Sequence, residues 1–161
     1  MPEKTFEFPV DRTAIMLFAR AVQDIRPEFT EPDSPEAQAL GGIVAPPTFT
    51  WASSHYEPDY SLDLTRPRKE PREPRPEGAG GGGGGLGRGL HGEQHYEYFK
   101  PIYAGDTLTV TIKPGATWEK EGRRGGKLRF SEQIYEYTNQ NGELCVRARM
   151  VGVQTEKAVE Q

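Results

Sequence analysis

The sequence has little cysteine and histidine, and it contains no long apolar run. Its 161 residues include one cysteine, Cys145, and three histidines without zinc-ligand spacing, so we expect no internal disulfide and no metal cofactor. No segment reaches the roughly 18 apolar residues of a membrane span, and the first ten residues lack the basic and apolar regions of a secretion signal. These absences predict a cytoplasmic protein in which Cys145, in an apparent strand, is a buried and inert thiol.

The composition is also low in apolar residues, at 34%, and the formal net charge is only -4. A mildly acidic chain has no general electrostatic reason to bind nucleic acid or anionic membranes. Its length allows one domain, which we place at residues 1–161. Residues 66–89 hold nine of the 19 glycines and four of the 14 prolines, so we expect a flexible insertion there. Its arginines alternate with glutamates, which favours a solvated linker over a nucleic-acid site, and it lacks the signature of a phosphate-binding loop.

The first part of the chain predicts a short strand followed by helices. Phe6, Phe8 and Val10 alternate as in a half-buried strand, and Asp11 begins a helix that extends to about Gln23. Ser34 and the proline after it are typical of the start of a short helix. Residues 46–56, with prolines only at their start, predict a buried helix entered at its first turn.

From Leu90 onward the sequence alternates as antiparallel strands do. Residues 127–138 and 143–155 read as two long strands, joined by a turn at Asn139–Gly142. Within each long strand the apolar parity slips, which indicates either a bulge or a change of buried face. The sum is an α+β fold with a helix packed on a curled sheet.

Three segments carry a resemblance to a known family. Residues 18–29, 41–49 and 99–108 resemble, in order and spacing, motifs of the MaoC-like (R)-specific enoyl-CoA hydratases, and in particular their N-terminal FAS1-like dehydratase halves. The resemblance implies the hot dog fold, a long antiparallel sheet wrapped around a central helix. It also implies an acyl-CoA or acyl-carrier thioester as substrate, no cofactor, and a homo- or hetero-oligomer with another hot dog subunit.

The departures from the family motifs concern the chemistry. Hydration of an enoyl thioester needs a carboxylate to activate water, an imidazole to deliver a proton, and an N–H group to hold the enolate oxygen. Asp24 matches the carboxylate of the family motif Asp-x-Asn-Pro-x-His, but Arg26 replaces its Asn and Phe29 stands in place of its His. At the second motif Ala45-Pro46 replaces His-Gly, and proline has no N–H to donate.

We therefore expect a hydro-lyase family member that is catalytically incomplete on its own. In the first hypothesis it is the half of a hydratase that shapes the acyl tunnel, while a partner hot dog supplies the catalytic Asp and His. The alternatives are a stand-alone homodimeric hydratase or thioesterase that uses Asp24, and a non-catalytic acyl-CoA-binding protein. The resemblance places the protein in fatty acid or steroid metabolism. The residues expected to line or support the substrate site are Phe29, Pro46, Pro47, Phe49, Trp51 and His91.

Overall fold

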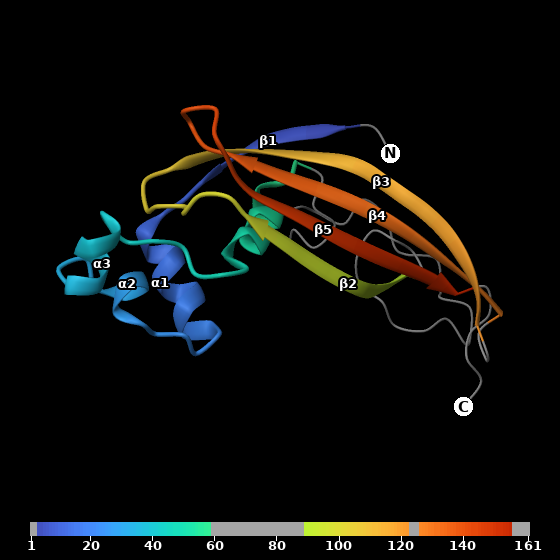
Figure 1. Cartoon of the computed structure of the whole chain (residues 1–161), viewed down its shortest axis with the longest axis horizontal. Coiled ribbons are helices and arrows are strands. Elements are labelled where there is room, and N and C mark those ends of the chain that lie inside the picture. The colour runs from blue at the N-terminus through green and yellow to red at the C-terminus, as the bar shows by residue number, and fades with distance from the viewer. Residues whose placement is uncertain (1–2, 59–88, 123–125, 156–161) are drawn as a thin grey trace, which may run out of the picture.

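The computed structural model describes residues 3–58, 89–122 and 126–155. The predicted insertion at 66–89 lies outside these residues except for Gly89. In chain order the elements are β1 (Lys4–Pro9), α1 (Arg12–Ala21), α2 (Pro27–Thr30), α3 (Pro35–Leu40), the 3₁₀ helix η1 (Phe49–Tyr56), β2 (Gly89–Tyr98), β3 (Thr107–Gly122), β4 (Gly126–Thr138) and β5 (Leu144–Thr155) (Figure 1). Within the described part of the chain, no helix combines the length and apolar character needed to cross a membrane.

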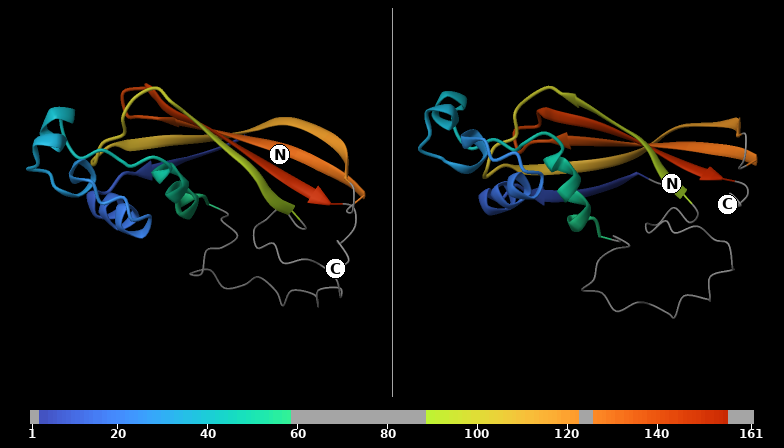
Figure 2. Two further views of the ribbon diagram at one scale, coloured as in Figure 1. Left: turned by 60° about the horizontal axis from the view of Figure 1, so that its bottom comes forward. Right: turned by 90° about the horizontal axis from the view of Figure 1, so that it is seen from below.

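The five strands form one antiparallel sheet in the order β1-β3-β4-β5-β2. Neighbours β3, β4 and β5 follow one another in the chain, whereas β1 and β2 close the two edges. The helices gather at one end of the curved sheet, and the far halves of β3, β4 and β5 extend beyond them (Figures 1 and 2). This arrangement confirms the predicted α+β class and its curled sheet.

The core lies between the helices and the near half of the sheet. Phe8, Leu108 and Val110 of the sheet pack with Ile15 of α1 and Phe49 of η1, and each of these side chains is almost completely buried. Burying one such side chain contributes about 1.5–3 kcal/mol to folding. The core therefore holds α1 and η1 on the sheet through apolar contact.

Helix α1 begins where its sequence predicts. The Asp11 carboxylate accepts hydrogen bonds from the Thr13 and Ala14 N–H groups at 2.7 and 3.1 Å, which satisfies two amides that a helix start leaves without partners. The helix ends at Ala21, two residues before the expected end, and Gln23 follows with a positive φ of 60°. This early end places Asp24 in a turn.

The segment predicted as a central buried helix is a helix of another type. Phe49–Tyr56 form a 3₁₀ helix, in which the Phe49 N–H donates to the Pro46 carbonyl and the Trp51 N–H to the Thr48 carbonyl. Pro46 and Pro47 cannot donate, and Thr48 has a left-handed φ of 67°. The helix buries Phe49, Thr50 and Ser53 against the sheet and leaves its other face exposed.

The parity slip in the two long strands is a change of buried face. Strands β4 and β5 pair in unbroken register from Leu128 to Tyr137, so successive residues alternate between the two faces throughout. Tyr135 and Tyr137 face inward, toward the helices, while Phe130 faces outward and stacks on Trp118 of β3 with ring centroids 5.1 Å apart. The register shifts between the described strands lie elsewhere, between His91 and Glu93 of β2, between Pro114 and Thr117 of β3, and at the turn end of the β4–β5 pair, between Tyr137 and Thr138.

The predicted turn at Asn139–Gly142 and a second turn before β3 both have a backbone that favours glycine. In the β4–β5 connection the Gly142 N–H donates to the Asn139 carbonyl, and Gly142 has a φ of 77°. Before β3, Gly105 has a φ of 97°, and the Asp106 carboxylate accepts a hydrogen bond from the Tyr103 N–H. Positive φ values of this kind favour glycine. Cys145, just after the first turn, is fully buried, and this burial raises the pKa of its thiol.

Candidate functional site

The segment that matches the hydratase motif forms the turn from α1 into α2. The Arg26 guanidinium donates from Nε and Nη2 to the two carboxylate oxygens of Asp24, at 2.8 and 2.9 Å. The Asp24 N–H in turn donates to the Ala19 carbonyl at 2.9 Å. The fork of Arg26 therefore fixes the carboxylate in one orientation and occupies both of its oxygens.

Arg26 also contacts the two other functional positions of this turn. Its guanidinium carbon lies 4.6 Å from the centroid of the Phe29 ring, and its Nη1 lies 3.1 Å from a carboxylate oxygen of Glu28. Phe29 itself is 4% exposed and belongs to the core. The position where the family has its imidazole thus holds a buried ring beneath a cation.

The electrostatics of the turn disfavour base catalysis by Asp24. The hydrogen bonds from Arg26 lower the pKa of Asp24 below its ordinary value, and they raise that of Arg26. A carboxylate of lowered pKa is a weaker base near neutral pH, where an efficient general base has a pKa close to the pH of the reaction. Glu28, the next carboxylate along this segment, is held by the same arginine.

Replacing Arg26 by alanine is expected to raise the pKa of Asp24 toward its ordinary value, because the hydrogen bonds and the positive charge are removed. The depressed pKa means that the contribution of this pair to stability is present above the ordinary Asp pKa of 3.8 and is lost as the pH falls through the lower folded-state pKa. Carboxyl NMR titration of both proteins measures the shift. An Asp24 pKa that is the same in Arg26→Ala as in the wild type would contradict the assignment.

The second motif leads into η1 with its amides already bonded. The Val44 N–H donates to the Glu28 carbonyl at 3.2 Å, and the Ala45 N–H donates to the Ile102 carbonyl at 2.8 Å. Pro46 and Pro47 have no N–H, and the Thr48 N–H donates to the Tyr98 hydroxyl at 3.3 Å. The Val44, Ala45 and Thr48 amides are therefore used within the chain and are not free to hold an oxyanion.

The third motif lies directly against the second. Val44 and Tyr103 form an antiparallel bridge, and the Tyr103 hydroxyl donates to the Leu40 carbonyl at 2.9 Å. A small hollow of about 60 Å³ lies where these segments meet the end of β2. Pro46 and Phe49 line it, with Thr48, Tyr98 and Ile102 among its other residues.

The remaining predicted site residues divide between core and surface. Pro46 is buried and Pro47 is exposed. Phe49 is 1% exposed, whereas Trp51, two residues later, is 44% exposed and meets the His91 ring edge-on at 5.8 Å. His91 lies on β2, and its ring contact is with Trp51 of η1 and not with Asp24, whose carboxylate is bonded to Arg26.

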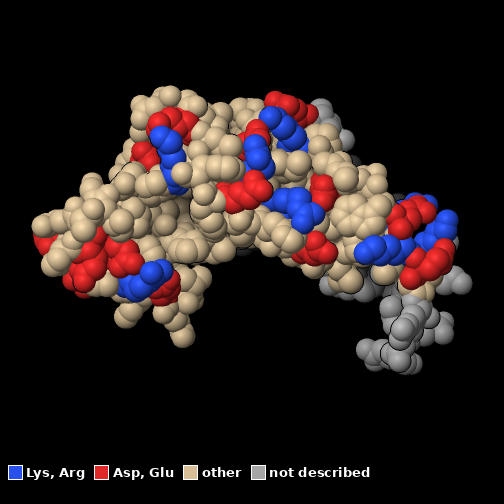
Figure 3. Space-filling view, in the orientation of Figure 1, with Lys and Arg blue, Asp and Glu red and all other residues tan. Residues whose placement is uncertain are grey.

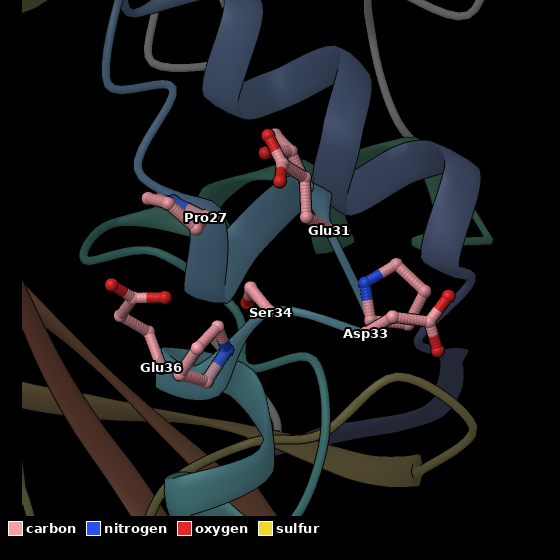
Figure 4. A pocket seen from close by; sticks show the side chains of 8 residues that line it. Pro27, Glu31, Asp33, Ser34 and Glu36 are labelled. Atoms are coloured by element: carbon pink, nitrogen blue, oxygen red, sulfur yellow. The ribbon is translucent and has the colours of Figure 1, made fainter.

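An open hollow of about 520 Å³ lies beside α2 and α3. Glu31, Asp33 and Glu36 stand around it, but their carboxylates point in different directions (Figure 4). The Ser34 hydroxyl is already the cap of α3, where it accepts from the Ala37 N–H at 3.1 Å. Acidic side chains gather over this end of the molecule, whereas the sheet carries both signs of charge (Figure 3). The hollow therefore lacks the convergent polar groups of a binding site.

The sequence gives no signal for a polar contact between η1 and the sheet. The buried Tyr137 hydroxyl lies 3.2 Å from the Ser53 Oγ and donates to the Thr50 carbonyl at 3.1 Å. Burial raises the pKa of Tyr137, and it raises that of its neighbour Tyr135 to about 12. Both phenols remain protonated at neutral pH, and that of Tyr137 acts as a fixed donor from β4 to η1.

The fold and the three joined motifs define a hot dog protein of the dehydratase class, and the sequence comparison specifies the family. Residues 2–148 match the FAS1-like, dehydratase domain region, so the chain belongs to this family. A UPF0336 protein of Streptomyces avermitilis is 31% identical over 114 residues, which are 66% of this chain and 61% of that protein. The chain thus spans about three fifths of the length of such relatives.

Solved structures of hot dog dehydratases and hydratases share the fold. The HadBC complex of Mycobacterium tuberculosis, a 3R-hydroxyacyl-ACP dehydratase, has a TM-score of 0.64 at 25% identity, with 94% of each chain covered. The ChsH1-ChsH2 complex of the same organism has a TM-score of 0.69 at 16% identity, with 99% of this chain and 86% of that chain covered. MaoC-like dehydratases and (R)-hydratases are similar as well, which confirms the family resemblance and the hot dog fold.

Proposed function

We propose that this chain is the non-catalytic half of an (R)-specific enoyl-thioester hydratase or dehydratase. It shapes the site of the acyl group, and a partner hot dog subunit supplies the catalytic Asp and His. The observation that carries this proposal is the turn in which Arg26 occupies both oxygens of Asp24 and covers the ring of Phe29. The carboxylate is held as a weak base, and the imidazole position is filled by a buried ring.

Two further features support a division of labour between subunits. The similar HadBC and ChsH1-ChsH2 structures are complexes of hot dog chains. In the described part of the sheet, β2 is an edge strand, and an edge strand presents backbone groups that a second chain can pair with. We therefore propose that the chain works in a hetero-oligomer on an acyl-CoA or acyl-carrier thioester.

The test is enoyl-CoA hydration by the chain alone, by a MaoC-like subunit that carries the Asp and His, and by the two combined. We expect turnover by this chain alone to be at least about 100-fold slower than by the pair, since a positioned acid or base contributes about 10²–10⁴-fold. Loss of the ultraviolet absorbance of short, long and steroid-like enoyl-CoAs measures the rate.

Matched substitutions identify which carboxylate acts. Asp24→Asn in this chain should leave the rate of the pair within about threefold, whereas Asn in place of the partner's catalytic Asp should reduce it by at least about 100-fold. Partner-free turnover that Asp24→Asn abolishes would establish a stand-alone hydratase. Thioester hydrolysis with the same sensitivity would indicate a thioesterase, and acyl-CoA binding without turnover in any combination would indicate a binding protein.

A further inference from the structure

Two side chains between η1 and the sheet, half-buried Gln94 and buried Thr50, have buried polar atoms without hydrogen-bond partners among the described residues. In the part of the chain that the structure describes, the carboxamide nitrogen and oxygen of Gln94 and the hydroxyl of Thr50 make no hydrogen bond. Buried polar groups are nearly always paired, because an unpaired group loses its hydration and gains nothing in return. A glutamine with both of its polar atoms unsatisfied calls for a functional explanation.

The strand register places Gln94 beneath η1. Gln94 pairs with Met150 of β5 and faces inward, between Tyr98 and the bulge that follows His91. On one side of it the Tyr98 hydroxyl accepts from the N–H of Thr48, the residue before η1, and on the other side His91 contacts Trp51 of η1. Gln94 therefore lies on the stretch of β2 over which the 3₁₀ helix passes.

The inward side chains around Gln94 are apolar or aromatic, except for one other glutamine. In the row next to it, Tyr135 of β4 and Tyr96 of β2 flank the small Ala148 of β5. Met150 of β5 lies between Gln94 of β2 and Gln133 of β4. The Gln133 carboxamide oxygen accepts from the Tyr135 hydroxyl at 3.1 Å. Of the two glutamines beside Met150, Gln133 is thus bonded within the chain and Gln94 is not.

We propose that Gln94 binds a hydroxyl group carried by the acyl chain of the substrate, beyond the carbon to which water is added. The proposal rests on the function proposed above. The free N–H and C=O of a carboxamide match a hydroxyl, which both accepts and donates, better than a ketone, which only accepts. The hydroxyl that hydration itself creates lies against the catalytic carboxylate and imidazole of the partner, so Gln94 is left to recognise a different oxygen. The preferred substrate class is accordingly a thioester whose acyl chain carries a hydroxyl group.

Binding of non-reacting probes tests this without catalysis. Dodecanoyl-CoA, its derivatives with one hydroxyl at carbons 3 to 12, and the matching ketones are titrated calorimetrically into the full chain and into its complex with the partner. We expect one derivative with a hydroxyl beyond carbon 3 to bind at least about tenfold more tightly than dodecanoyl-CoA, with its ketone in between, and Gln94→Met to abolish the preference.

The outcomes separate the two proposals. Equal binding of all probes, a preference confined to carbon 3, or a preference that survives in Gln94→Met overturns the role of Gln94, while the binding of dodecanoyl-CoA itself leaves the acyl-site function standing. If no probe binds the chain or the complex, the proposed function fails and the inference fails with it.

Thermal unfolding supplies a second readout that a structural glutamine would not give. Because Gln94→Met replaces an unpaired polar group with an apolar one of similar size, we expect Tm to rise by about 2–4 °C. Gln38→Met, on the exposed surface of α3, removes only an exposed hydrogen bond to the Asp33 carbonyl, so it should not raise Tm and should leave probe binding unchanged. A fall in Tm for Gln94→Met would show that the carboxamide holds the fold, and it would overturn the proposal.

Discussion

Phe49→Ala is expected to lower the free energy of unfolding by about 3–5 kcal/mol, the usual loss for a buried phenylalanine. The Phe49 ring is 1% exposed, stacks on Phe8 with centroids 5.6 Å apart, and meets Phe18 edge-on at 5.5 Å. It joins β1, α1 and η1, and alanine would leave a cavity among all three. Since a domain of this size has only about 5–15 kcal/mol of stability, the variant should be close to unfolding at physiological temperature.

Urea denaturation followed by circular dichroism measures this loss, with Trp51→Ala as the matched control. Trp51 lies on the same 3₁₀ helix but is 44% exposed, so its truncation should cost less than about 1 kcal/mol. Similar losses for the two variants would show that η1 is not anchored through Phe49. The comparison also separates a residue that supports the acyl site through the core from one that is accessible to a ligand.

Tyr137→Phe is expected to cost about 1–3 kcal/mol, because it removes a buried hydroxyl that bonds to η1 at two points. The Thr50 carbonyl and the Ser53 hydroxyl would lose their bonds to Tyr137. The raised pKa of Tyr137 adds a pH signature. The protonated phenol is favoured in the folded state, so its contribution is complete below the ordinary tyrosine pKa of 10.0 and is lost as the pH rises above it.

Denaturation of Tyr137→Phe and Tyr135→Phe at pH 7 and pH 10.5 tests both parts of this expectation. The Tyr135 hydroxyl donates to Gln133 within the same strand, so its removal should cost less and leave η1 in place. A larger loss for Tyr135→Phe, or a Tyr137→Phe variant as stable as the wild type, would be inconsistent with the contact between η1 and β4.

Most of the fold could be predicted because its signals are local. The cap at Asp11, the proline that starts α3 and the turn at Gly142 each depend on a few neighbouring residues. The type of η1 could not be predicted in this way. Its sequence is also compatible with an α-helix after the prolines. The 3₁₀ helix goes together with the left-handed φ of Thr48 and the hydrogen bond of Thr48 to Tyr98 on a distant strand, which the sequence does not reveal.

The candidate site was predictable in its residues and not in its contacts. The sequence shows that Asp24 is present and that Phe29 replaces an imidazole. The hydrogen bonds from Arg26 to Asp24, however, depend on the backbone conformation that follows the early end of α1. Gln94 gives no sequence signal at all, because whether a glutamine is bonded depends on what folds over it. Such residues can be found only after the register of the strands is known.

The exchange of apolar faces along the β4–β5 hairpin restricts how this hairpin can misfold. If β5 slipped by one residue, Arg147 and Arg149 would turn toward the core in the near half, and Val151 and Val153 would lose their apolar surroundings in the far half. An error of register would therefore be penalised at both ends of the strand, including the end that the helices do not cover. We therefore expect a slip of one residue to be strongly disfavoured in these long strands, since that alignment satisfies neither half.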